Sequence, residues 1–295
     1  MTLFDVPVGI WTGALDALAP AQAREQVAEL DEQGWGSLWY GEAYGREAFT
    51  NAAMLLGASE RLPVGTGIAN IYGRDAVAMK GAALTVAAQF PGRFVCGMGV
   101  SHQPLVERMR GHEYGGPIAT MRAYLDAMDQ APYAAVSPAE PPPFVLAALG
   151  PKMLELARDR TAGAHPYLAT PEHTAQAKDI LGPDKELVVE MAAVLSDDPD
   201  VWKARAHWHL EIYTGLPNYV NNWKRLGFTD DDAVRGGSDR LKEALVARGD
   251  ETAIRGKVQE HLDAGATQVV VQVLGENPAD VPTGDWRRLA PALTA

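Results

Sequence analysis

Residues 31–40 (DEQGWGSLWY), 159–168 (DRTAGAHPYL) and 262–271 (LDAGATQVVV) share one pattern, in which a helical stretch ends at a glycine and an apolar strand follows. Glycine just after a helix adopts the left-handed backbone conformation without the steric cost of a Cβ atom. Repeated after amphipathic helices, this corner is typical of sheets whose parallel strands are joined by helices. The three segments therefore predict either a βα barrel or an open, doubly wound sheet.

Eight candidate strands alternate with helical stretches along the chain. They span residues 6–11, 37–41, 63–69, 93–99, 144–149, 164–169, 187–195 and 267–274. No GxGxxG motif follows the first of them, which disfavours an open dinucleotide-binding sheet. The sequence thus predicts an α/β fold, a (β/α)8 TIM barrel in a single domain over residues 1–295. A helical insertion at about 197–250 is expected between the seventh and eighth strands, with the carboxylates of DDPD and TDDDA at helix starts.

Charge and composition exclude several classes of protein. The net charge of −12, with scattered acidic residues, argues against binding to nucleic acid or to an anionic membrane. No apolar run reaches the roughly 20 residues that cross a bilayer, and the N-terminus lacks the pattern of a secretory signal, so we expect a cytoplasmic protein. The single cysteine, Cys96, rules out an internal disulfide framework and a cysteine-rich metal site. Its apolar surroundings predict a buried thiol, with a reactive thiol as the alternative.

Polar and glycine-rich residues follow the predicted strands at the end where barrels place their active sites. Two of these segments suggest anion sites. Gly99 to His102 leads from a strand towards a helix and offers free backbone N–H groups. Gly150 and Pro151 stand at the start of a helix, with Lys152 beside them. Each segment is thus a candidate phosphate site, and the alternative is that these are the routine glycines of βα loops.

Two side chains are candidates for acid–base work. Glu42 lies on a loop rim near Tyr44 and Arg46, where it acts either as an acid or orienting group or as the partner of Arg46 in a surface ion pair. His102 donates a proton, binds an anion or caps a helix. In contrast, His207 and His209 are spaced so that they fall on different faces of a helix, and no metal site is expected there.

Four segments together resemble one family. WYGEAYGREAF (39–49), LPVGTGIANIYGRDA (62–76), QFPGRFVCGMGVSH (89–102) and LAALGPKMLELARDRTAGAHPYLATPEH (146–173) are similar to the luciferase-like monooxygenase superfamily, and within it to the coenzyme F420-dependent oxidoreductases of actinobacteria. The resemblance covers residues 5–195 and resumes near 250–275. Relatives carry histidine or aspartate at Glu42 and glutamate at His102, which suggests that an acid–base pair is exchanged in position.

The resemblance implies that the cofactor lies across the mouth of the barrel. It implies a non-proline cis peptide at Gly67-Ile68 that supports the ring, together with Ala69 and Asn70. The cofactor phosphate would meet Gly99, Val100, Ser101 and His102 and the helix start at Gly150 and Pro151. Glu42 and His102 are the expected catalytic groups, with Tyr44 and Tyr72 lining the substrate side.

The function that follows is hydride transfer between C5 of coenzyme F420 and a small organic substrate. The alternatives are an FMN-dependent monooxygenase of the same superfamily, a non-catalytic flavin- or F420-binding protein, and a barrel lyase without a redox cofactor. The residues do not identify the substrate. A homodimer is expected from the family.

Overall fold

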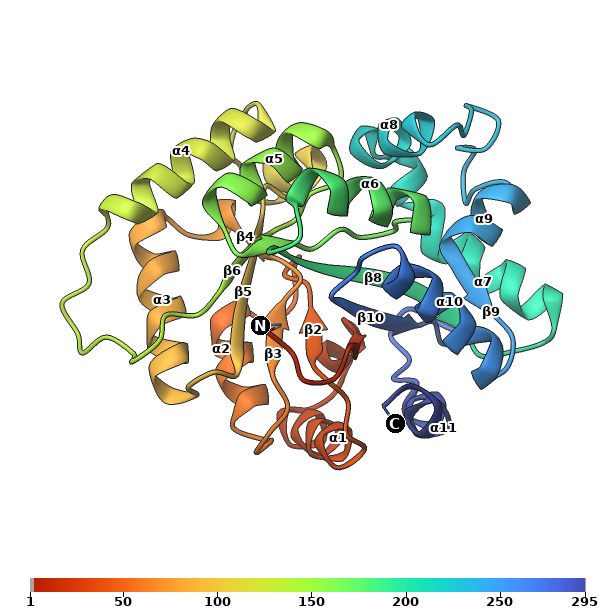
Figure 1. Cartoon of the computed structure of the whole chain (residues 1–295), viewed down its shortest axis with the longest axis horizontal. Helices are drawn as coiled ribbons and strands as arrows, with labels where there is room; N and C mark the ends of the chain where they lie inside the picture. The colour runs from red at the N-terminus through yellow and green to blue at the C-terminus, as the bar shows by residue number, and fades with distance from the viewer. Residues whose placement is uncertain (1–2, 295) are drawn as a thin grey trace.

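The computed structural model describes residues 3–294 and contains a closed ring of parallel strands. Figure 1 shows the strands at the centre with helices around them. The ring consists of β1 (Val8–Trp11), β2 (Leu38–Tyr40), β3 (Val64–Thr66), β5 (Phe94–Gly99), β6 (Phe144–Leu146), β7 (Gly163–Ala164), β8 (Glu186–Val194) and β10 (Gln268–Val273). Each strand pairs in parallel with the next, and β10 closes the ring by pairing with both β1 and β8. The predicted (β/α)8 barrel is confirmed.

Helices connect successive strands and pack on the outside of the ring. They are α1 (Pro20–Glu32), α2 (Ala48–Leu56), α3 (Ala76–Gln89), α4 (Pro117–Gln130), α5 (Pro151–Arg160), α6 (Pro171–Leu181), α10 (Glu251–Asp263) and, after the last strand, α11 (Thr283–Leu293). Short helical turns add η1 (Ala14–Ala17), η2 (Ile71–Gly73) and the π-type η3 (Leu105–Met109), and the two-residue strand β4 (Ala69–Asn70) pairs with β5. This arrangement directs the carboxyl ends of all ring strands to one mouth.

The segment between β8 and α10 is longer than the other connections. It holds α7 (Pro199–Glu211), η4 (Tyr213–Gly215), α8 (Pro217–Arg225), α9 (Asp239–Leu245) and the strand β9 (Val246–Arg248), which pairs with β8. Asp198 caps α7, as the DDPD motif predicts. The TDDDA motif starts no helix, and that prediction is wrong. Its Asp232 instead accepts hydrogen bonds from Thr229 and Ser238 within a loop.

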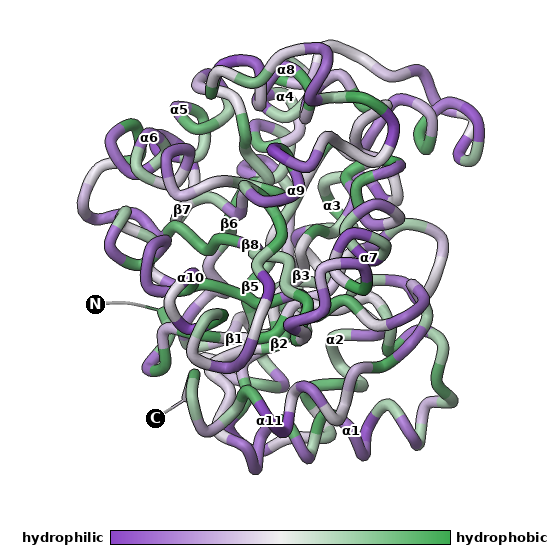
Figure 2. Tube along the Cα trace, turned by 90° about the vertical axis from the view of Figure 1, so that its right-hand side faces the viewer, coloured by the Kyte–Doolittle hydropathy of each residue, from purple (hydrophilic) through white to green (hydrophobic). Residues whose placement is uncertain are grey.

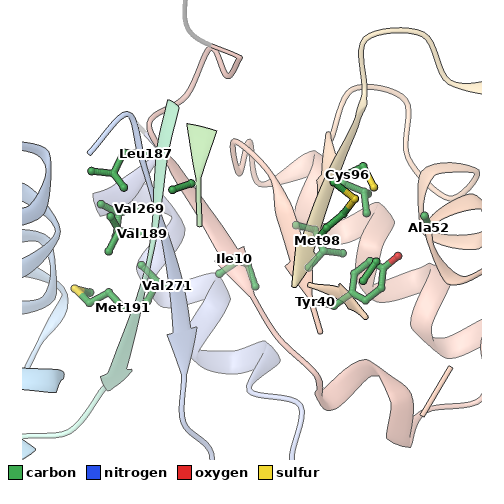
Figure 3. Close-up of a cluster of buried hydrophobic side chains, with 14 of the residues drawn as sticks. Ile10, Tyr40, Ala52, Cys96, Met98, Leu187, Val189, Met191, Val269 and Val271 are labelled. Atoms are coloured by element: carbon green, nitrogen blue, oxygen red, sulfur yellow. The ribbon is translucent and has the colours of Figure 1, made fainter. Parts of the chain in front are cut away.

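Alternate residues of the long strands face opposite sides. Leu187, Val189 and Met191 of β8 point to the same side as Val269 and Val271 of β10 (Figure 3) and belong to the main core beneath the helices. The intervening Val188 and Val270 fill the ring interior with Trp39, Val95 and Val145. Full burial of one such side chain contributes roughly 1.5–3 kcal/mol, so both faces of the sheet stabilise the fold.

The glycine corners explain the connections, with one exception. Gly34 and Gly265 adopt left-handed conformations with φ of 80° and 101°, as expected after α1 and α10. Gly163 does not, because it lies inside β7. A Cβ atom there would lie 2.0 Å from the carbonyl oxygen of Glu186, so this glycine allows two strands to approach closely.

The central strands are mostly hydrophobic, while the outer helices alternate between hydrophilic and hydrophobic residues (Figure 2). Cys96 is buried in the core, and burial raises the pKa of its thiol to about 12, which confirms the structural interpretation of this residue. Within residues 3–294, no helix is both long enough and apolar enough to span a bilayer.

Candidate active site

The residues predicted at the mouth lie next to one another in space. The amide of Glu42, after β2, donates to the carbonyl of Ile68, after β3, at 3.1 Å. Asn70 is paired in register with Gly99, at the end of β5. A Cβ atom on Gly99 would lie 2.7 Å from the Ile68 side chain, so this glycine leaves the space that Ile68 occupies. The ends of β2, β3, β4 and β5 therefore form one continuous surface.

The Gly67-Ile68 peptide bond is cis, as the resemblance implies. The indole of Trp11 donates to the Gly67 carbonyl at 3.3 Å, and the Gly67 amide donates to the Tyr40 carbonyl at 2.6 Å. A Cβ atom on Gly67 would lie 2.6 Å from Nε2 of His165 and 2.7 Å from the Trp11 indole nitrogen. Only glycine fits this position, because two rings approach it from the barrel interior.

His165 packs against Gly67 from the interior of the barrel. Its ring stacks on Trp39 with centroids 4.7 Å apart, and its Nδ1 lies 2.8 Å from the Val188 carbonyl. A carbonyl oxygen only accepts, so Nδ1 carries the proton and Nε2 presents a lone pair. Burial lowers the pKa of His165 to about 4, which keeps the ring neutral near pH 7.

Asn70 offers a free donor beside the cis peptide. Its Oδ1 accepts from the Tyr72 amide at 2.9 Å and so begins the η2 turn. Its Nδ2 is buried and has no partner among the described residues. A buried amide group without a partner is costly, so this atom is suited to a ligand acceptor at the mouth.

Glu42 is paired with Arg74. Its two oxygens accept from both terminal nitrogens of Arg74, one of them at 2.9 Å, and from the amides of Asn70 at 2.8 Å and Ala48 at 3.3 Å. The alternative of an ion pair with Arg46 is wrong, because Arg46 instead contacts Asp16 at 3.7 Å. Sequence proximity favoured Arg46, whereas the turn after β3 brings Arg74 to the carboxylate. Glu42 thus anchors the loops after β2 and β3.

His102 lies half-buried at the end of the β5 loop. Its ring is 5.7 Å from that of Tyr219 in α8, and burial lowers the pKa of its imidazole. The preceding Ser101 has a left-handed backbone, with φ of 58°. The helix that follows is only the five-residue η3, so it supplies less dipole to an anion than the sequence suggested.

The helix start at Gly150 and Pro151 matches the prediction more closely. Gly150 is the N-cap of the ten-residue helix α5, and Pro151 occupies its first turn. A Cβ atom on Gly150 would lie 3.5 Å from a terminal nitrogen of Arg225, which comes from α8. That guanidinium donates to Asn222 at 2.9 Å and forms no ion pair within the described chain. Sequence reasoning missed Arg225, since nothing in its local sequence links it to α5.

The two predicted substrate-side tyrosines differ in their surroundings. Tyr44 is 79% exposed on the rim. Tyr72 accepts a hydrogen bond from the Gly115 amide at 3.2 Å and stacks with Tyr114 at a centroid distance of 5.9 Å. Tyr72 therefore supports the loop before α4, and Tyr114 ties that loop to the carbonyl of Ser101 at 3.3 Å.

An aromatic cluster, not predicted from the sequence as a site, lies where the insertion meets the barrel. It consists of Trp11, Tyr167, His209, Tyr213 and Tyr219, whose rings contact one another across four elements of the structure. The Tyr167 hydroxyl donates to Gln272 of β10 at 2.6 Å. The carboxyl of Glu190, inside the apolar strand β8, lies beside this cluster. An acid within the run LVVEMAAVL was the one local signal of this site.

No cluster of three or more histidine, cysteine, aspartate or glutamate side chains in residues 3–294 is arranged to hold a metal ion. His209 is buried in the aromatic cluster, whereas His207 packs against Gly236. The two histidines therefore face different surroundings, as their spacing predicts.

Comparisons with known proteins identify the family of this chain. The model of the luciferase-like monooxygenase family matches residues 1–270. A Mycobacterium tuberculosis protein named as a coenzyme F420-dependent oxidoreductase is 24% identical, over 90% of this chain and 94% of its own length.

Two solved structures share the fold over nearly their whole lengths. The coenzyme F420-dependent tetrahydromethanopterin reductase of Methanopyrus kandleri has a TM-score of 0.75 at 17% identity, covering 98% of each chain. An F420-dependent secondary alcohol dehydrogenase, solved with an F420–acetone adduct, has a TM-score of 0.74 at 15% identity, covering 98% of this chain and 99% of its own. Because the family model spans most of the sequence, the chain belongs to the luciferase-like monooxygenase family.

Proposed function

We propose that this protein is a coenzyme F420-dependent oxidoreductase that transfers a hydride between the deazaflavin and a small organic substrate. The observation that carries the proposal is the buried Nδ2 of Asn70, which has no hydrogen-bond partner in the described chain and lies at the end of β4 beside the ends of β2, β3 and β5. The F420-dependent relatives support this choice of cofactor over FMN. When bound, F420 would supply or accept the hydride at C5.

The chain's own residues would hold the two ends of the cofactor differently. Gly67, Ile68 and Ala69 would support the ring, with Asn70 donating to one of its polar edge atoms. The start of α5 at Gly150 and Pro151 would receive the phosphate of the tail, since helix starts favour anions. Arg225, which has no carboxylate partner in the described chain, would add a charge-assisted hydrogen bond.

The loop from Gly99 to His102, which is also predicted from the sequence to bind the cofactor, would contact the cofactor tail at a second point. Val100, Ser101 and His102 are each only half-buried, so a ligand can reach them. The left-handed turn at Ser101 helps to point successive amides to one side, as in backbone anion nests. His102 remains our candidate for a proton-carrying group. Glu42 would act by orienting the loops, because donors already occupy both of its oxygens.

A titration of the purified protein with F420, FMN and NADPH, followed by tryptophan fluorescence, tests the cofactor. Trp11 is bonded to the cis peptide and is a built-in reporter. We expect micromolar or tighter binding of F420, weaker binding of FMN, and a smaller signal in Trp11→Phe. FMN binding alone would indicate a flavin monooxygenase, and binding of none of the three would favour the lyase alternative.

Catalysis is tested separately from binding. Loss of the oxidised F420 absorbance with a screened alcohol or ketone would separate an enzyme from a non-catalytic carrier. The predicted homodimer is tested by light scattering. Val77, Val136 and Ile212 are large apolar side chains that are exposed in the described chain.

A further inference from the structure

The carboxyl of Glu190 is fully buried and only half satisfied. Its Oε2 accepts from the Leu168 amide at 2.9 Å. Its Oε1 has no hydrogen-bond partner within residues 3–294. Leu168 holds a left-handed backbone, with φ of 54°, and its carbonyl accepts from the Trp223 indole at 3.3 Å. The backbone around Leu168 therefore fixes one oxygen of Glu190 and leaves the other free.

The Glu190 carboxyl lies near three tyrosines of the aromatic cluster, and the residue that binds its other oxygen, Leu168, directly follows one of them, Tyr167. Tyr167 follows β7, Tyr213 forms η4, and Tyr219 belongs to α8. Burial raises the pKa of all three phenols, and the nearby Glu190 carboxyl adds to the rise. His209 of α7 closes the cluster, and its buried Nε2 also lacks a partner in the described chain. Two unpartnered polar atoms in one aromatic cluster point to a polar ligand.

We propose that this cluster binds an uncharged ring alcohol or ketone and that Glu190 is the catalytic acid–base residue that contacts its oxygen. The proposal rests on the proposed function, because it requires the F420-bound ring site beside it. That site is adjacent, since Trp11 contacts both Gly67 and Tyr167, and Tyr219 contacts His102. Aromatic walls suit a ring, and the absence of a cation from the cluster as defined argues against an anionic substrate.

In the reducing direction, a bound ketone is converted into an alcohol. The carbonyl carbon gains a hydride, supplied by reduced F420, and a C–H bond forms as the C=O π bond breaks. The oxygen takes the proton of Glu190, and an alcohol results. Glu190 is left as a carboxylate and regains a proton from solvent. In the oxidising direction, Glu190 must first be a carboxylate to accept the hydroxyl proton.

The protonation state of Glu190 agrees with this role. Burial raises the pKa of Glu190 to about 8, although the Leu168 amide opposes the rise. Burial also lowers the pKa of His209 to about 4. Near pH 7, the cluster therefore presents a protonated acid and a neutral imidazole, and a general acid works best with a pKa near the working pH.

Infrared difference spectroscopy of the apo protein tests the acid directly. Wild type minus Glu190→Gln at pH 7 is expected to show the carbonyl band of one protonated carboxyl. Cyclohexanol, which has no carbonyl of its own, should shift that band to lower frequency on binding. The matched control is Glu186→Gln, because Glu186 is a buried acid at the other end of β8 that accepts from the Leu3 amide at 3.0 Å. Its difference spectrum should not respond to cyclohexanol.

Turnover with cyclohexanone and reduced F420 tests the proton transfer. Glu190→Gln keeps a donor, so cyclohexanol affinity should change less than about 3-fold while kcat falls at least about 100-fold, the range of general acid catalysis. Glu190→Leu should lose both binding and turnover. Cyclohexanecarboxylate should compete at least about 10-fold more weakly than cyclohexanol, and Glu186→Gln should behave as wild type.

The two proposals fail differently. If wild type does not bind F420, the proposed function is wrong and so is the redox step assigned to Glu190. If F420 binds equally to wild type and Glu190→Gln but the variant keeps full kcat, only the role of Glu190 is overturned. Absence of the protonated-carboxyl band, or a band that cyclohexanol does not shift, also overturns it. A kcat loss with the band and F420 affinity as expected supports it.

Discussion

Gly67 is the residue at which the fold and the candidate cofactor site constrain each other most closely. A Cβ atom there would meet ring nitrogens of His165 and Trp11 at 2.6 and 2.7 Å. His165 is stacked on buried Trp39 and has little freedom to move away. We expect Gly67→Ala to displace the support of the cofactor ring and weaken F420 binding about 10-fold or more, since about 1.4 kcal/mol corresponds to a factor of ten.

The control for this variant is Gly81→Ala. A Cβ atom on Gly81 meets nothing within 4 Å, and the residue lies inside helix α3. Alanine should stabilise that helix by up to about 1 kcal/mol and leave F420 affinity unchanged. Equal F420 affinity in Gly67→Ala and Gly81→Ala, measured by fluorescence titration, would remove the cis bulge from the cofactor site.

The pair between Glu42 and Arg74 makes a second prediction about single residues. Their side chains are 7% and 10% exposed, so removing one partner leaves the other charged and buried. Arg74→Met should lower the free energy of unfolding by about 3–5 kcal/mol, the usual cost of breaking a buried pair. Adding Glu42→Leu in the same chain should restore part of this loss.

Arg160→Met serves as the comparison in urea denaturation. Arg160 also contacts two carboxylates, of Asp126 and Asp129, but both of these are exposed. Exposed ion pairs contribute about 0–1 kcal/mol each, so the variant should be close to wild type. Similar losses in the two arginine variants would contradict the anchoring role of Glu42 and return it to the candidates for proton transfer.

At the scale of elements, helix α8 brings Arg225 to the start of α5. Arg225→Gln should weaken F420 binding by about 10- to 100-fold, because a hydrogen bond to a charged group contributes about 1.5–3 kcal/mol. The phosphate-free deazaflavin riboside should bind the variant and wild type equally. Arg24→Gln, on the exposed side of α1, controls for the change in net charge. An equal loss of affinity for both ligands would place Arg225 outside the phosphate site.

The elements themselves could be predicted because their signals are local. Period-two and helical apolar patterns depend on neighbouring residues, and so do the glycine corners at Gly34 and Gly265. Gly163 could not be interpreted in this way. A glycine is needed there because the backbone of Glu186 on the neighbouring strand lies too close for a Cβ atom, and the local sequence does not show which strands pair. The first ring strands and the loops after them were therefore located closely, whereas the cis peptide after Gly67 was expected only from the family resemblance.

The parts of the site that the sequence did not predict come from contacts between distant segments. Arg74 rather than Arg46 meets Glu42 because the barrel, not sequence proximity, sets their distance. Arg225 and Tyr219 reach the mouth on a helix whose position no local pattern encodes. Glu190 was not predicted either, although a lone acid in an apolar strand is unusual and is a local signal that could have identified it.

At the scale of the whole molecule, buried titratable groups predict how stability depends on pH. Burial lowers the pKa of His165, His209 and His261 to about 4 and also lowers those of His102 and His173. Below the ordinary histidine value of 6.5, the unfolded chain binds protons that the folded chain does not. Stability should therefore fall as the pH drops from 6.5 towards 4.

Glu190 acts in the opposite direction. Its pKa of about 8, against an ordinary 4.5, means that the folded chain keeps a proton that the unfolded chain releases. The contribution of Glu190 to the free energy of unfolding is fully present below pH 4.5. It is lost as the pH rises towards 8, at about 1.4 kcal/mol per pH unit. Below pH 6.5, the five histidines with lowered pKa outweigh one glutamate. Between pH 6.5 and 8, Glu190 is the group of the described chain whose shifted pKa changes stability, so the free energy of unfolding should be largest near pH 6.5.

Urea denaturation at pH 5, 6.5 and 8 measures how the free energy of unfolding depends on pH. The variant Glu190→Gln removes the glutamate's part of this dependence and leaves that of the histidines. Glutamine resembles the protonated acid but cannot ionise, so the variant should lose the decline between pH 6.5 and 8 while keeping the acid-side loss. Its stability relative to wild type should thus increase with pH, by about 2 kcal/mol across that interval. A wild type as stable at pH 8 as at 6.5, or a variant whose curve runs parallel to wild type, would mean that Glu190 is already a carboxylate in the folded protein. A carboxylate at that position would have no proton to give a ketone, so the same curve tests the acid that the aromatic cluster requires.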